Sequence, residues 1–220
     1  MTQDSQPFDP DDLRFFGAIA ASISHEMKNV VTIINEAAGL LHDLSLSAEA
    51  GKRPLDPTRI KKMSADVGRN VERGVGIINR MNRFAHSVDE PERSFNLGDL
   101  VSDAVALASR FAAGRSVELR FDPPREPVLA RAYPFGVYRA VISALHIHVC
   151  HGSGLRPVVA TVCCAQGGAT VRVSRSALSP GDDLDTRLAE LSSLVTLLRG
   201  AAHVERDDTR DVCVLRWNSD

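Results

Sequence analysis

A short run of reactive side chains stands near the N-terminus, where His25 is followed by Glu26, Lys28 and Asn29. A neutral imidazole is a good nucleophile near pH 7 and can carry a phosphoryl group on a ring nitrogen. The adjacent carboxylate can accept the proton on Nδ1, which leaves Nε2 free to attack. The amide of Asn29 can hold a water molecule or a phosphoryl oxygen. These residue types therefore indicate phosphoryl chemistry, with His25 as the reacting group.

The motif alone does not decide the question, because a single histidine on a helix is usually a solvated surface residue. A zinc-peptidase site is excluded, since Asn29 stands where the H-E-x-x-H motif needs its second histidine. The pattern of the surrounding sequence must supply the rest of the argument.

Two long segments with helical periodicity surround the reactive run. Between Leu13 and Leu46 apolar residues recur at steps of three, four or seven, which predicts an amphipathic helix: Phe16, Ile19, Ile23, Val30, Ile34, Ala37, Leu41 and Leu44. Residues 47–57 contain glycine and two prolines and predict a turn. A second stripe follows from Thr58: Ile60, Met63, Val67, Val71, Ile78, Met81 and Ala85. We expect a helical hairpin that pairs with a second copy as a dimeric four-helix bundle; the alternative is that its stripe packs on the downstream domain.

On the first of these helices, the spacing puts one set of polar residues on a common face, away from the apolar stripe: Ser22, His25, Asn29 and Thr32. We therefore expect the imidazole of His25 to point outward. A macromolecular partner could then reach it.

The segment from Phe15 to Glu36 (FFGAIAASISHEMKNVVTIINE) resembles the dimerisation and phosphoacceptor domain of sensor histidine kinases. Their phosphoacceptor box has the approximate pattern S-H-E-[LM]-[RK]-[NT]-P-L, which residues 24–29 match in order. Val30 and Val31 replace the usual Pro-Leu, a departure that removes a helix kink and leaves the reacting group unchanged. The resemblance implies three chemical roles, phosphoacceptor, acid/base partner and phosphatase-type residue, for His25, Glu26 and Asn29 respectively. It also implies that a response-regulator receiver domain binds this face, and we expect its contacts at Ser22, Lys28 and Thr32.

The chain after the hairpin changes to a mixed pattern of helices and strands. Residues 87–94 are charged and contain proline, so they predict a linker. Beyond it we expect helices at 97–112, 134–150 and 184–199, with strands at 117–121, 128–131, 158–164 and 169–175 and two more before the C-terminus. This order, and the run at 95–101, resemble the ATP-binding α/β sandwich of the same kinases. The expected division is a flexible tail at 1–12, the phosphoacceptor hairpin at 13–88 and a degenerate ATP-binding-like domain at 95–220.

The nucleotide-binding motifs of that kinase domain are missing from this sequence. Ser143 and Ile147 stand where the kinases have the two asparagines of N-x-x-x-N-A, which serve Mg²⁺ and phosphate. Arg175 replaces the aspartate of the D-x-G-x-G motif that recognises adenine, and residues 182–190 replace the G-x-G-L loop. We therefore expect no nucleotide or other cofactor on this chain, with Mg²⁺ held by the partner receiver domain instead.

Composition narrows the classes of function that remain possible. The net charge of −2 and the hydrophobic fraction of 44% are ordinary for a globular protein and give no general attraction to nucleic acid. We expect no secretory signal and no membrane span, and a cytoplasmic location with the cysteines reduced. A group of metal-binding side chains falls on different faces of one predicted helix, so we expect no metal site there: His146, His148, Cys150 and His151.

The leading hypothesis is a histidine phosphotransferase of a two-component phosphorelay. It would take phosphate from the aspartate of one receiver domain and pass it to another, with a hybrid histidine kinase as a possible upstream source. Two alternatives stay open at this point. One is a phosphatase of phosphorylated receivers that uses Glu26 and Asn29, and the other is a non-catalytic pseudokinase adaptor.

Overall fold

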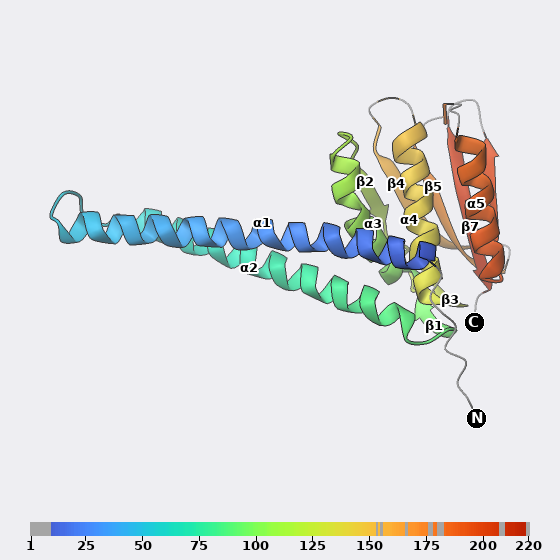
Figure 1. Cartoon of the computed structure of the whole chain (residues 1–220), viewed down its shortest axis with the longest axis horizontal. Coiled ribbons are helices and arrows are strands. Elements are labelled where there is room, and N and C mark those ends of the chain that lie inside the picture. Colours follow the sequence, from blue (N-terminus) through green and yellow to red (C-terminus); the bar gives the residue numbers. More distant parts are fainter. Residues whose placement is uncertain are drawn as a thin grey trace. The chain divides into compact units, whose positions relative to one another are not determined.

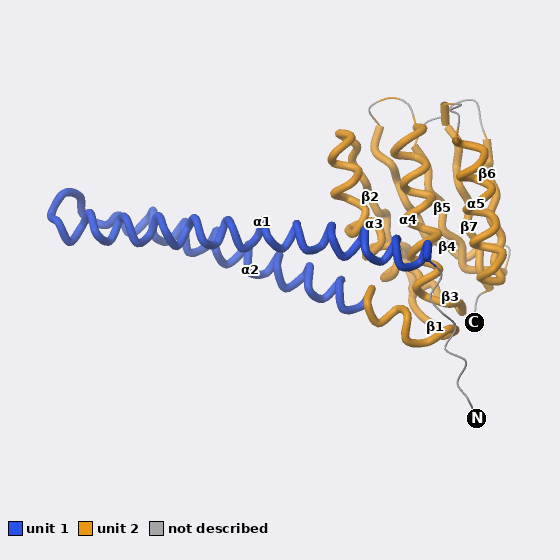
Figure 2. Tube along the Cα trace, viewed as in Figure 1, with its two compact units in different colours: residues 1–83 blue, residues 84–220 orange. Residues whose placement is uncertain are grey.

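The computed structural model describes residues 10–218 except 153, 155, 166, 176–177, 180–182 and 207–209. By its internal contacts the chain divides into two units, Met1–Arg83 and Phe84–Asp220 (Figure 2). Most of the expected N-terminal tail, residues 1–9, lies outside the described part, and residues 10–12 already belong to a helix. None of the helices in the described ranges is both long and apolar enough to cross a membrane.

The first unit is a helical hairpin of α1 (Pro10–Glu49) and α2 (Pro57–Ala85) (Figure 1). The acidic residues Asp11 and Asp12 lie in the first turn of α1, where the helix dipole favours negative charge. The turn uses Gly51 at a φ of +65°, a backbone conformation that glycine adopts without strain. The carboxylate of Asp56 then accepts the backbone N–H of Thr58 at 2.9 Å and caps the start of α2.

The two helices come close together at Gly74 of α2, which is buried. A Cβ atom at this position would lie 3.3 Å from Cγ1 of Val30 and 3.9 Å from Sδ of Met27. The glycine therefore allows α2 to approach α1 within the two turns that follow His25.

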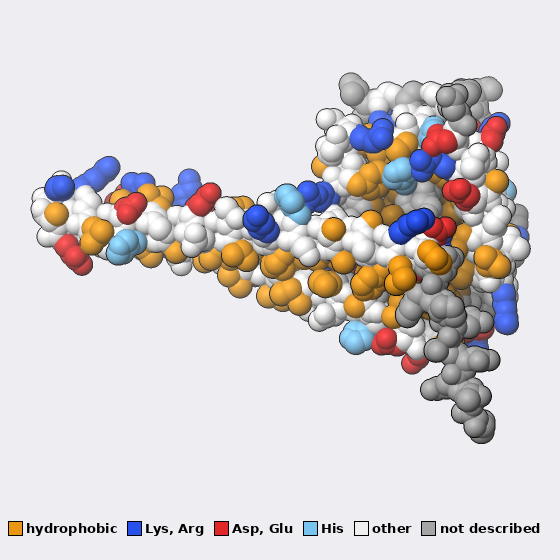
Figure 3. All heavy atoms as spheres, viewed as in Figure 1, with side chains coloured by type: hydrophobic (Ala, Val, Ile, Leu, Met, Phe, Trp, Pro, Cys, Tyr) orange, Lys and Arg blue, Asp and Glu red, His pale blue; other side chains and the backbone are white. Residues whose placement is uncertain are grey.

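The hairpin also leaves many large apolar side chains exposed, and they gather along its length (Figure 3). Four of them share one face of α2 at steps of three or four, and we call this set the apolar stripe of the hairpin: Val71, Val75, Ile78 and Met81. Others are exposed at several positions around α1: Val31, Ile33, Leu40, Leu41 and Leu46. Exposed fractions of 52% for Val75 and 49% for Ile78 are high for aliphatic side chains on a long helix.

The second unit is an α/β sandwich. Its helices are α3 (Leu97–Ala113), α4 (Pro134–His151) and α5 (Leu184–Leu197), which lie over one face of a sheet (Figure 1). That sheet has the order β2-β4-β5-β7-β6, formed by β2 (Leu119–Asp122), β4 (Val158–Ala165), β5 (Gly168–Ser174), β7 (Asp211–Asn218) and β6 (Ala201–Arg206). The strands β2 and β4 are parallel and the other neighbours are antiparallel.

Alternation along the central strands places the core of this unit between sheet and helices. Val171 of β5 pairs with Val162 of β4 and Leu215 of β7, and all three side chains are buried. Leu145 of α4 and Trp217 of β7 are buried as well. The α/β fold expected from the sequence, with a helical hairpin before it, is confirmed.

The strand β1 (Arg93–Asn96) was not expected, because it begins inside the predicted linker. It pairs with β3 (Leu129–Ala132) as a separate two-stranded sheet, with Arg93 opposite Ala132. A short helical turn, η1 (His86–Val88), precedes it, and the buried hydroxyl of Ser87 donates to the carbonyl of Phe84 at 2.5 Å. Because this segment contains charged residues and a proline, its composition predicts a linker and not an ordered strand.

Candidate functional site

His25 lies near the middle of α1, and its side chain is exposed. Asn29 and Thr32 are exposed on the same face, while Ser22 is half-buried. The next apolar positions, Ile23 and Val30, are buried. The spacing of α1 thus separates a buried side from a polar face that carries the histidine, as the sequence predicts.

Lys28 is also exposed, one turn after His25 and next to Asn29. Its ammonium group is a mobile point charge on a flexible stem, suited to attract an anionic group without fixing its geometry. The polar face therefore carries an exposed nucleophile, an exposed cation and an exposed amide within five consecutive residues.

Glu26 has a partner that sequence reasoning missed. Its Oε1 accepts a hydrogen bond from Nη2 of Arg73 at 3.0 Å, which links α1 to α2 beside the histidine. The side chain of Glu26 retains 31% of its exposure and that of Arg73 49%, so both stay within reach of solvent. No periodic signal in α2 distinguishes Arg73 from the other arginines of that helix.

The two helices of the hairpin have opposite charge. Between residues 10 and 49, α1 carries six acidic and two basic residues, whereas α2, residues 57–85, carries seven basic and two acidic residues. The candidate site therefore stands on an acidic helix beside a basic one.

In the second unit, Arg175 stands at the sequence position where the resemblance expects the aspartate that recognises adenine. The residue is buried, with 9% exposure. The guanidinium donates to four backbone carbonyls: Arg156 at 3.0 Å, His148 at 3.3 Å, Gly152 at 2.9 Å and Gly154 at 2.6 Å. A planar group with five N–H donors suits this task, and it ties the end of α4 to the loop that follows.

The backbone after β5 also bonds to the C-terminal end of α4. Leu178 forms an isolated β-bridge with Gly152, and the N–H of Ser179 donates to the carbonyl of His151 at 2.8 Å. The buried carboxylate of Asp211 accepts the N–H of Leu178 at 2.7 Å. Side chains and backbone of this chain thus bond to one another around the C-terminal end of α4.

The histidines of α4 form part of this packing. The ring of His146 stacks on Phe111, with ring centroids 4.8 Å apart, and its Nδ1 lies 3.3 Å from Nη1 of Arg187 on α5. Burial, reinforced by Arg187, lowers the pKa of His146. Burial also lowers the pKa of the fully buried His148 to about 4, although the Asp211 carboxylate opposes that effect. Across the described ranges, no group of three or more His, Cys, Asp or Glu side chains is placed to hold a metal ion.

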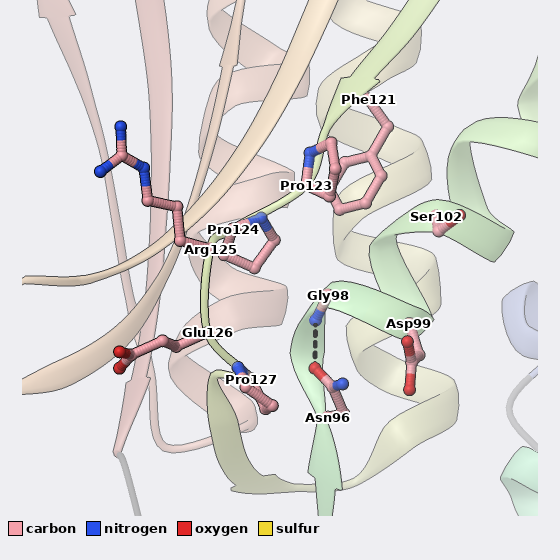
Figure 4. A pocket seen from close by; sticks show the side chains of 10 residues that line it. All are labelled: Asn96, Gly98, Asp99, Ser102, Phe121, Pro123, Pro124, Arg125, Glu126 and Pro127. Atoms are coloured by element: carbon pink, nitrogen blue, oxygen red, sulfur yellow. Dashed lines mark hydrogen bonds between the residues drawn. The ribbon is translucent and has the colours of Figure 1, made fainter.

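An open hollow of about 530 Å³ lies elsewhere on the second unit, at the start of α3. Phe121 of β2 and three prolines of the β2–β3 loop line one side, and Asn96 caps the helix by accepting the N–H of Gly98 at 3.0 Å. Figure 4 shows Arg125 and Glu126 pointing away from the other residues that line the hollow. The sequence did not indicate this feature, because it depends on the path of the loop.

Comparison with known proteins bears on the fold. No protein-family model and no curated protein matches the sequence. Among solved structures, the catalytic domain of the histidine kinase ThkA covers 59% of this chain and 97% of its own, at 13% identity and a TM-score of 0.51. The Acinetobacter baumannii histidine kinase AdeS covers 89% of this chain and 98% of its own, at 11% identity and a TM-score of 0.49. The element order of the second unit and the ThkA match together show that this unit has the fold of a histidine-kinase catalytic domain.

Proposed function

We propose that this chain is a histidine phosphotransferase of two-component signalling, which carries a phosphoryl group on His25 to and from the receiver domains of response regulators. The observation that supports the proposal is the contrast between an exposed His25 in a motif that resembles a phosphoacceptor box and a kinase-like fold in which the buried Arg175 bonds backbone carbonyls of its own chain. A histidine that ATP does not serve needs another phosphoprotein as its donor.

In the proposed reaction, Nε2 of His25 attacks the phosphorus of the receiver's aspartyl phosphate in line. The new N–P bond forms as the P–O bond to the aspartate breaks, and the receiver's carboxylate leaves with the electron pair. Glu26 takes the proton of Nδ1 and so makes Nε2 the nucleophile. Mg²⁺ on the receiver neutralises charge in the transition state, and the same steps in reverse pass the group to a second receiver.

The proposed absence of ATP-dependent autophosphorylation rests on the contacts around Arg175. A nucleotide would have to displace a guanidinium that satisfies four carbonyls and a backbone bridge between Leu178 and Gly152. Ile147, at a position where the resemblance requires an asparagine, is 2% exposed and offers no ligand for Mg²⁺. Cofactor-free transfer is therefore the economical interpretation.

We propose further that the chain acts as a homodimer through the apolar stripe of the hairpin. In a four-helix bundle of two hairpins, α1 of one copy lies beside α2 of the other. The acidic α1 would then face the basic α2 of the second copy, so charge complementarity supports a second copy as the partner. Pairing would cover the exposed Val71, Val75 and Ile78.

The other partners follow from the same chemistry. Receiver domains would dock on the polar face at Ser22, Lys28 and Thr32, with the second unit as additional docking surface. An upstream hybrid histidine kinase, which carries its own receiver, would supply the phosphate in the cytoplasm. Nucleic acid and membranes have no part in this scheme.

The experiment that tests the proposal is a labelling assay with the purified full chain. One sample receives labelled ATP alone, and another receives receiver domains already phosphorylated on aspartate. We expect acid-labile, base-stable label to arrive only from the receiver, and His25→Ala to abolish it. Label from ATP alone would contradict the proposal.

A receiver phosphatase is the second candidate, and the exposed Asn29 on the face of His25 favours it. An amide one turn after the histidine can orient a water molecule toward the receiver's phosphate. The same assay separates the two, because a phosphatase releases free phosphate from the receiver without label on this chain.

A further inference from the structure

The ion pair between Glu26 and Arg73 joins residues 47 positions apart, and Glu26 is the residue that follows the proposed phosphoacceptor in the sequence. Arg73 donates from Nη2 to Oε1 of Glu26 at 3.0 Å, from the second helix to the first. The side chains of both residues are about a third to a half exposed, at 31% and 49%. A pair this open contributes little to the stability of a fold, so its placement calls for a chemical explanation.

The packing of the hairpin brings Arg73 to this position. The next residue, Gly74, is buried, and a Cβ on it would lie 3.3 Å from Cγ1 of Val30, one turn beyond Glu26. A larger residue would hold α2 away from α1 at this level. The close approach at Gly74 therefore allows the guanidinium of the preceding residue to reach the carboxylate.

The proposed chemistry creates an electrostatic conflict at Glu26. A phosphoryl group adds roughly two negative charges at neutral pH, and on His25 it would sit beside the negative carboxylate. The carboxylate must nevertheless stay in place if it is to hold the proton of Nδ1. A cation that bonds the carboxylate from the far helix meets both needs, because it fixes the side chain and offsets its charge.

We propose that Arg73 is a positioning residue for phosphoryl transfer, which holds Glu26 beside His25 and offsets its charge while the phosphoryl group is present. This inference rests on the proposed function. It gives a residue of α2 a role in a reaction whose motif lies wholly on α1. The guanidinium acts through Glu26 and needs no contact with the reacting atoms.

The chain offers a matched control in Arg69, one turn earlier on α2. Its guanidinium pairs with Asp66 on the same helix, so it has the same charge and a similar exposed setting without the link to Glu26. Arg73→Ala, Arg73→Lys and Arg69→Ala can be compared in the full chain, together with Glu26→Gln and the double variant of Arg73→Ala with Glu26→Gln.

The measurement is the rate of transfer from a phosphorylated receiver to His25, followed over a range of receiver concentrations. A second arm uses phosphoramidate, a small donor that phosphorylates histidine without a docking partner. We expect Arg73→Ala to lower the maximal rate about tenfold in both arms, with the half-saturating receiver concentration unchanged. Arg73→Lys should recover most of the rate, and Arg69→Ala should behave as the wild type.

The double variant tests most directly whether Arg73 acts through the carboxylate of Glu26. If Arg73 acts through that carboxylate, the double variant should transfer no more slowly than Glu26→Gln alone. A wild-type rate for Arg73→Ala, losses that multiply in the double variant, or no recovery with Arg73→Lys would each overturn the inference. If the wild type takes no label on His25 from the receiver, the proposed function itself fails, and the inference falls with it.

Discussion

The hairpin and the second unit differ in how they place the polar side chains of their motif positions. On α1, His25 is exposed and the adjacent Glu26 is bonded from the neighbouring helix, so these polar side chains are open to solvent. In the second unit, the buried Arg175 and the backbone around Leu178 bond to the end of α4 and to the loop that follows it. The difference shows that polar groups of one chain can stay exposed on a helical hairpin while those of its sandwich domain bond to one another.

The largest effect should come from the hairpin. His25→Ala removes the only nucleophile that the proposal uses, so phosphoryl transfer should fall by at least about a thousandfold, to the background of the assay. The exposed side chain contributes little to packing, and thermal unfolding should be unchanged. Exposed His42 on the same helix provides the control, since His42→Ala should transfer at the wild-type rate.

A charge on the apolar stripe should separate the two copies of the proposed dimer. Val75→Glu places a carboxylate where two hairpins would pack, which should weaken association by about a hundredfold or more because the charge must be desolvated. Sedimentation equilibrium over micromolar concentrations measures the change. Leu197→Glu is the control, because Leu197 on α5 is 83% exposed and should tolerate a charge without any change in mass. A monomeric wild type would contradict the homodimer.

The second unit should respond to Arg175 by losing stability. Arg175→Ala removes the guanidinium from four carbonyls and should lower the free energy of unfolding by about 3 kcal/mol. The carbonyl of His148 keeps the N–H of Gly152 as a donor, and water compensates at the exposed Gly154. Denaturant unfolding can be followed by fluorescence of Trp217, the single tryptophan, which is buried in this unit.

The control for Arg175 is Arg172 on β5, whose guanidinium pairs with Glu205 at the exposed face of the sheet. Arg172→Ala should cost less than about 1 kcal/mol, since exposed ion pairs add little. Arg175→Asp should destabilise the unit at least as much as Arg175→Ala without restoring ATP binding. Equal losses for Arg172→Ala and Arg175→Ala would show that the buried guanidinium of Arg175 contributes no more to stability than the exposed one of Arg172.

Much of this difference between the hairpin and the second unit could be predicted from the sequence, because it depends on periodicity and on single substitutions within motifs. The apolar steps of α1 place His25 on a polar face, and the order of helices and strands identifies the sandwich. The substitution of Arg175 for the motif's aspartate is likewise visible in the sequence, although its four carbonyl partners are not. These features are local, so one window of sequence contains them.

The remainder depends on contacts between distant residues, which no local pattern reveals. Arg73 reaches Glu26 from another helix, and Arg175 bonds carbonyls 19 to 27 positions away. The strand β1 forms from Arg93 onward because β3 offers it a partner, against the composition of its own segment. Tertiary pairing overrides local preference in each case.

The smallest predicted effect concerns the pH dependence of the second unit. Burial lowers the pKa of His148 to about 4, below the value of about 6.5 for an unfolded chain. Above pH 6.5 neither state binds the proton. Between pH 6.5 and 4 the unfolded state binds it and the folded state does not, so stability should fall as the pH is lowered. The loss between pH 7 and 5 should be about 2 kcal/mol.

His148→Leu should remove the part of the loss that His148 contributes, whatever its effect on stability at neutral pH, because the leucine has no proton to bind. The part due to His146, whose pKa burial also lowers, should remain. The comparison is the difference between the free energies of unfolding at pH 7 and pH 5, measured with Trp217 fluorescence for wild type and variant. His203→Gln is the control, since His203 is exposed on the edge strand β6 and its replacement should leave the loss in place. A variant that keeps the full loss would show that groups other than His148 make the sandwich sensitive to acid.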